Sequence, residues 1–368
     1  MNFDPRLEKL ADVLVNYSLG VKPGQWVALQ GDVVTLPALR AVHDKIIAAG
    51  GHTSFFLSDE AMQRSFYRLA NDEQLTWINP MQRLAIEQAD ARVNILGSSN
   101  TRAMTGIDSR RVQKQRAATT ELMQIFMQRS AQGEMNWTLA QFPTEANAQE
   151  ANMSLEDYAD FVYSACYCDR EDPVAEWRKV QAMQQHKVDY LKGKKQVRCQ
   201  GPNIDLTLSI EGRTFINADG SRNMPDGEIF TGPVEDSVDG WVRFSYPSIV
   251  NGQAVSGIEL TFEQGKVVKA SAEVNDDLLQ AQLDTDAGAR YLGEFAIGTN
   301  FGIQRFTSNI LFDEKIGGTI HMAIGNAYPE TGGKNRSAVH WDMICDMRSD
   351  SQILVDGELF YENGQFKV

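Results

Sequence analysis

The stretch NIDLTLSI, residues 203 to 210, alternates apolar and polar side chains at every position. Its apolar members are Ile204, Leu206, Leu208 and Ile210. Successive side chains of a β-strand point to opposite faces, so this pattern predicts a strand with one buried face and one face in water. The chain before this stretch and the chain after it show different patterns, and the contrast decides the predicted fold.

Helical and strand patterns alternate upstream of this stretch. Apolar residues recur at helical spacing in two segments, Leu7 to Leu14 and Leu39 to Ile46, and His43 lies on the second apolar stripe as a core or boundary residue. Strand-like segments follow at residues 25–32, 52–59 and 91–98. This alternation predicts an α/β region with an open, mostly parallel sheet covered by helices.

A last helix and a change of pattern mark the end of the α/β region. Asp172 and Pro173 form a good helix start, an N-cap followed by proline at the first helical position, and the helix should end near Leu191. Downstream, Asp356-Gly357 and Asn363-Gly364 predict β-hairpins between apolar runs. We therefore expect two domains, 1–192 and 193–368, with a β-rich α+β second domain.

Composition excludes several classes of partner. The 368 residues carry a formal net charge of -14, whereas nucleic-acid and anionic-membrane binding depend on Lys and Arg. The N-terminal sequence MNFDPRLEKL lacks the apolar region of a signal peptide, and no apolar run is long enough to span a membrane. The four cysteines form no CxxC pair, as expected of reduced thiols. We predict a cytoplasmic protein with no nucleic-acid or membrane partner.

The segment GGTIHMAIGNAYPETGGKNRSAVHWDMICDMR, residues 317 to 348, contains two of the five histidines of the chain, His321 and His340. His340 is two residues from Asp342, so in a strand both side chains project from the same face. Imidazole and carboxylate groups that converge are typical of a divalent metal site. A structural histidine and a surface ion pair are the alternative interpretations.

Three more candidate groups occur in glycine-rich turns of the second half. They are Glu228, Glu294 and Tyr328. Two divalent cations would be balanced by the carboxylates of Glu228, Glu294 and Asp342 together with one hydroxide. Imidazole with carboxylate suits zinc, cobalt or manganese better than calcium. A paired site of this kind can activate a water molecule for peptide hydrolysis.

Three segments carry a family resemblance: NMPDGEIFTGP, YLGEFAIGTN and DEKIGGTIHMAIGNAYPETGGKNRSAVHWDMICDMR. They resemble the signature segments of the aminopeptidase T and aminopeptidase S family of metallo-aminopeptidases. The resemblance implies a cytoplasmic, two-domain homodimer that hydrolyses the N-terminal peptide bond of short peptides. Each subunit would hold two divalent ions (zinc, cobalt, manganese or magnesium), and residues 1–192 would shape and cover the substrate cavity. The metal-site positions would be Glu228, Glu294, His321, Tyr328, His340 and Asp342.

Some roles stay open at this point. Glu294 or Glu228 would pass a proton from water to the leaving amine. Tyr328 would either ligate a metal or donate a hydrogen bond to the developing oxyanion. The alternative functions are another metallohydrolase, such as an amidase or phosphoesterase, and a non-catalytic metal-binding protein. The motifs HExxH, G-x-S-x-G and GxGxxG do not occur, so other protease, hydrolase and dinucleotide-binding classes are not favoured.

Overall fold

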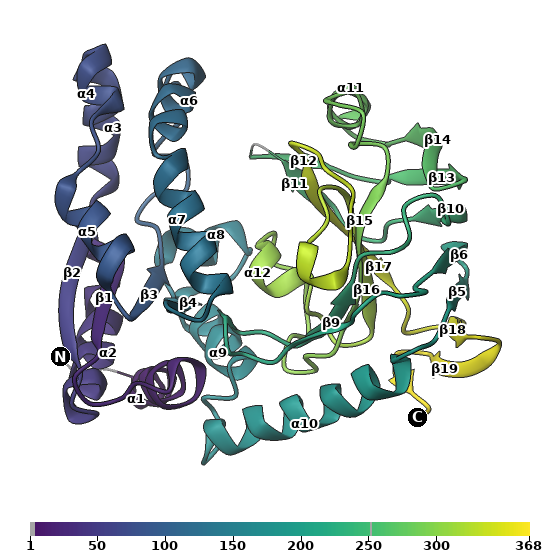
Figure 1. Cartoon of the computed structure of the whole chain (residues 1–368), viewed down its shortest axis with the longest axis horizontal. Coiled ribbons are helices and arrows are strands. Elements are labelled where there is room, and N and C mark those ends of the chain that lie inside the picture. Colours follow the sequence, from purple (N-terminus) through teal and green to yellow (C-terminus); the bar gives the residue numbers. More distant parts are fainter. Residues whose placement is uncertain (1–3, 251) are drawn as a thin grey trace. The chain divides into compact units, whose positions relative to one another are not determined.

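The structure, a computed structural model, describes residues 4–250 and 252–368, and Figure 1 labels most of their helices and strands. The chain forms two compact units. The first extends to Glu176 and includes Gly220–Pro225, and the second comprises Trp177–Asp219 and Asp226–Val368. This division lies within helix α10 (Pro173–Leu191), whereas the boundary expected from the sequence follows that helix.

A five-stranded, wholly parallel sheet forms the centre of the first unit, in the order β2-β1-β3-β4-β8. Its strands are β1 (Trp26–Asp32), β2 (His52–Ser58), β3 (Ala91–Leu96), β4 (Asn136–Gln141) and β8 (Asn223–Met224). Its α-helices are α1 (Pro5–Asp12), α2 (Leu36–Ala48), α3 (Glu60–Leu69), α4 (Asp72–Thr76), α5 (Pro80–Gln88), α6 (Ser109–Ala118), α7 (Thr120–Ala131), α8 (Glu145–Glu150) and α9 (Leu155–Ala165). A π-helical segment, Val13–Leu19, continues α1, and a short 3-10 helix, Val33–Thr35, precedes α2. The predicted α/β architecture is confirmed.

The first two helices show why the sequence pattern predicted them. Asp4 caps α1 by accepting the backbone N–H of Arg6, and the apolar stripe that begins at Leu7 is buried. In α2 the apolar stripe is likewise buried, and His43 is only partly buried. His43 Nδ1 lies 2.7 Å from the Thr53 hydroxyl oxygen, as expected of a satisfied boundary histidine.

Antiparallel sheets form most of the second unit. The eight-stranded sheet has the order β14-β13-β10-β6-β5-β18-β19-β20, and the five-stranded sheet has the order β17-β16-β15-β9-β7. The first contains β5 (Gln196–Gly201), β6 (Ile204–Ser209), β10 (Asp239–Arg243), β13 (Glu259–Glu263), β14 (Lys266–Ser271), β18 (Gln352–Val355), β19 (Glu358–Glu362) and β20 (Gln365–Phe366). The second contains β7 (Ile216–Ala218), β9 (Glu228–Thr231), β15 (Leu292–Gly298), β16 (Thr319–Gly325) and β17 (His340–Asp346). A small hairpin pairs β11 (Ser248–Val250) with β12 (Gln253–Val255).

The predicted strand and hairpins of the second half are present. Every second residue of β6 from Ile204 is buried, as the alternation requires. Asp356-Gly357 connects β18 to β19 and Asn363-Gly364 connects β19 to β20, with positive φ at all four residues. The β-rich second half is therefore confirmed.

The two larger sheets of this unit contribute to one apolar core. Leu206 and Leu208 enter it from the eight-stranded sheet, and Phe295, Ile320 and Met343 enter it from the five-stranded sheet. Because side chains alternate along a strand, the neighbours of these last three residues point from the opposite face of the five-stranded sheet. That opposite face carries the candidate site.

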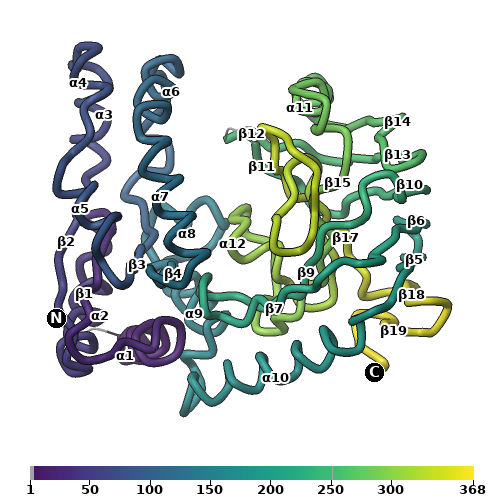
Figure 2. Tube along the Cα trace, in the orientation of Figure 1, coloured from purple at the N-terminus to yellow at the C-terminus, as the bar shows by residue number. Residues whose placement is uncertain are grey.

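Short helices and a returning segment complete the unit. The helices are α11 (Asp276–Leu283), α12 (Ile310–Asp313) and a 3-10 turn, Pro329–Thr331. On α10, the side-chain amide of Gln184 donates to the Ala218 and Glu228 carbonyl oxygens, which ties the helix to β7 and β9. Between β7 and β9 the trace runs through Gly220–Pro225, which belongs to the first unit (Figure 2). Among the described residues, no helix combines the length and the apolar character of a membrane span.

Candidate metal centre

Strand register brings five of the six predicted site residues to one face of the five-stranded sheet. Ala323 of β16 pairs with Glu294 on one side and Asp342 on the other. Two residues before Ala323, His321 shares its face, as His340 does two residues before Asp342. Glu228 pairs with Gly298, four residues after Glu294, and so joins the same face. The pleat alone therefore gathers these groups from four strands.

Short distances join these side chains into one cluster. The Nε2 atom of His321 lies 3.3 Å from Glu228 Oε2 and 3.7 Å from Glu294 Oε1. The Nε2 atom of His340 lies 3.3 Å from Glu294 Oε2 and 3.6 Å from Asp342 Oδ1. Glu294 thus lies between the two imidazoles, with one oxygen facing each. The predicted common direction of His340 and Asp342 is confirmed.

Backbone carbonyl groups orient both histidines. His321 Nδ1 lies 2.8 Å from the Glu314 carbonyl oxygen, and His340 Nδ1 lies 2.8 Å from the Asn326 carbonyl oxygen. A carbonyl oxygen only accepts, so Nδ1 carries the hydrogen in each ring. Nε2 is then the atom that each histidine directs toward the carboxylates, which is the arrangement found in metal-ligating histidines.

Burial and close charges shift the pKa values of the cluster. Burial raises the pKa of Glu228 well above its usual range. Burial also acts to raise the pKa of Glu294, but hydrogen bonds from the two histidines outweigh it and lower the pKa to about 2. Burial lowers the pKa of His321, yet the facing carboxylates overcome this effect and raise it to about 10. In the same way the pKa of His340 rises to about 9. Burial raises that of Asp342 to about 6.

Tyr328, the sixth predicted residue, lies beside this cluster. Its ring packs edge-on against the His340 ring, with centroids 5.0 Å apart, and against the Phe230 ring at 5.5 Å. Burial and the nearby carboxylates raise the pKa of its hydroxyl above the ordinary value, so the phenol holds its proton. A protonated hydroxyl can donate a hydrogen bond, and the two roles considered for Tyr328 both remain predictions.

Glu314 is a member of the cluster that the sequence interpretation missed. Ligand atoms of Glu314, His321 and Asp342 all lie within 4.8 Å of one another, as do those of Glu294, His340 and Asp342. Asp342 is common to both groups. Glu314 lies in the segment DEKIGG directly before β16, within one of the three segments that carry the family resemblance, but nothing in its spacing marks this glutamate as part of the site.

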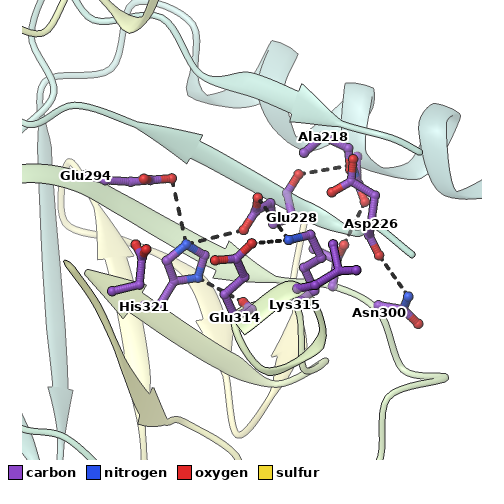
Figure 3. Close-up of polar contacts among 12 residues, drawn as sticks. Ala218, Asp226, Glu228, Glu294, Asn300, Glu314, Lys315 and His321 are labelled. Carbon is purple, nitrogen blue, oxygen red and sulfur yellow. Dashed lines mark hydrogen bonds and ion pairs between the residues drawn. The ribbon is translucent and has the colours of Figure 1, made fainter. Parts of the chain in front are cut away.

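Lys315 brings a buried ammonium group to the same place. Its side chain has no exposed surface, its Nζ contacts Glu314 Oε1, and it lies 3.9 Å from Glu228 Oε1 (Figure 3). Burial lowers the pKa of this ammonium, but the adjacent carboxylates outweigh burial and raise it, so Lys315 is charged. The cluster therefore includes the ammonium of Lys315, in addition to the two histidines, before any metal binds.

The residues present fit divalent metal ions. Glu228 Oε2 and Asp342 Oδ1 are buried and accept no hydrogen bond from the described residues, and each has a histidine Nε2 within 3.6 Å as its ion-pair partner in the metal-free protein. A buried carboxylate oxygen without a donor is costly unless a cation neutralises it. The donor set combines imidazole nitrogen with carboxylate oxygen, which suits zinc and other first-row divalent ions. This chemistry supports a divalent metal centre on this face of the sheet.

Comparison with known proteins agrees with this chemistry. Residues 3–366 match the family model described as thermophilic metalloprotease (M29). The chain is 29% identical to aminopeptidase T of Thermus thermophilus over 98% of this chain and 96% of that protein. It is 28% identical to aminopeptidase 2 of Geobacillus stearothermophilus over 96% and 94% of the two chains. The solved structure of wild-type AmpT from Thermus thermophilus superposes with a TM-score of 0.86 at 26% identity, covering 99% of each chain.

Proposed function

This chain belongs to the thermophilic metalloprotease family M29, and from that premise we propose that it removes N-terminal residues from short peptides at the centre described above. It is a metal-dependent aminopeptidase, because its family is one of metalloproteases and its full-length relatives are named aminopeptidases. Its short-peptide substrates, its cytoplasmic location and its homodimeric state are the finer parts of this proposal. So is the assignment of residues 1–192 to shaping and covering the substrate cavity.

The observation that carries the proposal is the pair of overlapping ligand groups that share Asp342. We propose that these groups hold two divalent ions, with His321 near one ion and His340 near the other. Glu294 faces both imidazoles, so its carboxylate would help to hold the ions at both positions. When bound, such ions polarise the peptide carbonyl and activate water for attack. Zinc, cobalt or manganese suits this donor set better than calcium.

Glu228 and Tyr328 have separate proposed roles, one in proton transfer and the other in stabilising developing negative charge. Glu228 has one carboxylate oxygen near His321 and the other near Lys315, at the edge of the cluster and not between the imidazoles. This position supports Glu228 as the group that takes a proton from water and passes it to the leaving amine. Tyr328 keeps its proton beside His340, which supports a hydrogen bond from its hydroxyl to the oxyanion that develops on the carbonyl.

Metal removal and substrate panels test the function together. Protein dialysed against a chelator should lose hydrolysis of amino-acid p-nitroanilides and dipeptides, and zinc, cobalt, manganese or magnesium should restore it to different extents. N-acetylated versions of the same substrates are the control, because an aminopeptidase requires the free amine. Hydrolysis that survives metal removal contradicts the proposal. Activity on p-nitrophenyl phosphate without peptidase activity would favour a phosphoesterase instead.

A further inference from the structure

Lys315 is a fully buried ammonium group in a cluster of acids, and the functional proposal gives it no role. Lysine is seldom buried completely unless it is paired. Here Nζ contacts Glu314, which is partly buried, and lies 3.9 Å from Glu228, which is buried (Figure 3). The cost of burying this charge indicates that the carboxylates gain from its presence.

The backbone holds Lys315 in a defined place relative to Glu228. Asn300 N donates to the Lys315 carbonyl oxygen at 3.0 Å. The side-chain amide of the same Asn300 donates to the Asp226 carbonyl oxygen at 2.8 Å, two residues before Glu228. One asparagine thus links the chain segment of the ammonium to the chain segment of the carboxylate. Gly227, between Asp226 and Glu228, lies against this asparagine, because a Cβ there would be 2.7 Å from the Asn300 Cβ.

The charges of the cluster explain what such an ammonium would do. Glu228, Glu294, Glu314 and Asp342 are four acids close together, two of them buried and two partly buried, and like charges at this spacing repel one another where little water is present. A divalent ion relieves that repulsion when it binds. In the metal-free protein the relief must come from protons and from the permanent positive charge of Lys315.

We propose that Lys315 is a resident counter-ion: it stabilises the carboxylate cluster of the metal-free protein and thereby lowers the affinity of the centre for divalent ions. It is a positioning residue that acts through Glu228 and Glu314. The proposal rests on the metal centre of the proposed function. A purely structural ion pair would instead contribute equally to stability with and without metal.

The counter-ion role and a purely structural role predict different changes in Co²⁺ affinity when the charge of Lys315 is removed. Lys315→Met removes the charge and keeps most of the side-chain length. If Lys315 is a counter-ion, the variant should bind Co²⁺ at least about tenfold more tightly than the wild type, because the remaining acids attract a cation more strongly. The affinity is measured by competition with a chromophoric chelator.

Thermal unfolding gives a second, linked measurement. Without metal the melting temperature of Lys315→Met should fall by at least about 6 °C, since one partner of a buried ion pair is lost. At saturating Co²⁺ the fall should be much smaller, because the ion supplies the missing charge. The matched control is Arg213→Met in the same unit, where a side chain 6% exposed pairs with Glu235. Its loss should be similar with and without Co²⁺.

Each result decides the question. If the wild type binds no Co²⁺, the proposed metal centre itself fails, whatever Lys315 does. If the wild type binds Co²⁺ and Lys315→Met binds it equally or more weakly, the counter-ion role is refuted. A variant that folds only with Co²⁺ supports the role, and one that stays unfolded at saturating Co²⁺ refutes it.

Discussion

Gly293 sits at a bulge in β15, and a single methyl group there should disturb the metal centre. Leu292 pairs with Ile324 and Glu294 pairs with Ala323, so Gly293 is the extra residue of the bulge. A Cβ at Gly293 would lie 2.3 Å from the Asn326 carbonyl oxygen and 2.5 Å from the Gly325 carbonyl oxygen. Ordinary contacts begin at 3.4 Å, so the backbone must move by about 1 Å (3.4 minus 2.3).

The movement would reach two candidate ligands at once. Glu294 is the next residue of the strand, and the Asn326 carbonyl oxygen is the acceptor that orients His340. Overpacking of this kind costs about 1–3 kcal/mol of stability. Misplacement of reacting groups by about 1 Å can lower the rate by about a hundredfold. We therefore expect Gly293→Ala to fold, to bind Co²⁺ more weakly and to lose about a hundredfold in kcat/KM.

The assay is kcat/KM on an amino-acid p-nitroanilide at saturating metal, with Co²⁺ affinity and thermal unfolding measured on the same preparation. Gly357→Ala is the control. Gly357 has φ +84° in a hairpin turn with nothing within 4 Å of an added Cβ, so the variant should lose about 1 kcal/mol of stability and no activity. A Gly293→Ala enzyme with wild-type kcat/KM and Co²⁺ affinity would refute the idea that the bulge sets the ligand positions.

Three further predictions follow from the same site. Asp342→Asn should reduce the bound metal at both ion positions, because both candidate ligand groups share Asp342. Elemental analysis of the purified protein measures the metal content, and Asp346→Asn on the same strand is the control. Unchanged metal content in Asp342→Asn would contradict the shared role. His321 and His340 have pKa values raised to about 10 and about 9, above the ordinary 6.5, so metal-free protein should lose stability as pH rises from 6.5 toward 9.5. Saturating metal should remove that slope of melting temperature against pH, and a slope unaffected by metal would show that other groups cause it. Leu206→Ala should cost about 2–5 kcal/mol in chemical denaturation, because Leu206 lies in the shared core of the two sheets, and a loss below about 1 kcal/mol would place it outside that core.

Much of the fold could be predicted from local sequence patterns. The helix from Pro173 to Leu191 begins after its predicted N-cap, Asp172, and ends at the predicted residue, and β6 follows its alternation residue by residue. These features depend on neighbours in the chain, which a sequence displays directly. The return of Gly220–Pro225 to the first unit depends on pairing between β4 and β8, which lie far apart in sequence, and no local pattern announced it.

Some residues of the candidate site could likewise be predicted from local patterns, and others could not. His340 and Asp342 could be paired from their spacing, because the period of a strand decides which side chains share a face. Glu228 and Glu294 were candidates from their glycine-rich turns, but their place in one site with the histidines followed from the family resemblance, since no single strand shows the register between β9, β15 and β16. Glu314 and Lys315 were missed because a turn, and not a periodic element, directs their side chains toward the cluster.

Because the segment Gly220–Pro225 belongs to the first unit but lies in sequence within the second, neither unit can be expressed complete as one continuous fragment of the chain. A fragment that stops at Glu176 would lack β8, and the edge of β4 that β8 covers would keep unpaired backbone groups that invite aggregation. A fragment that begins at Trp177 would carry β8 as a loop with no sheet to join. Insertions and deletions between β7 and β9 are constrained as well, because only three residues separate the end of β8 from Glu228. The β-rich unit and the parallel sheet therefore have to be encoded and expressed together as one chain.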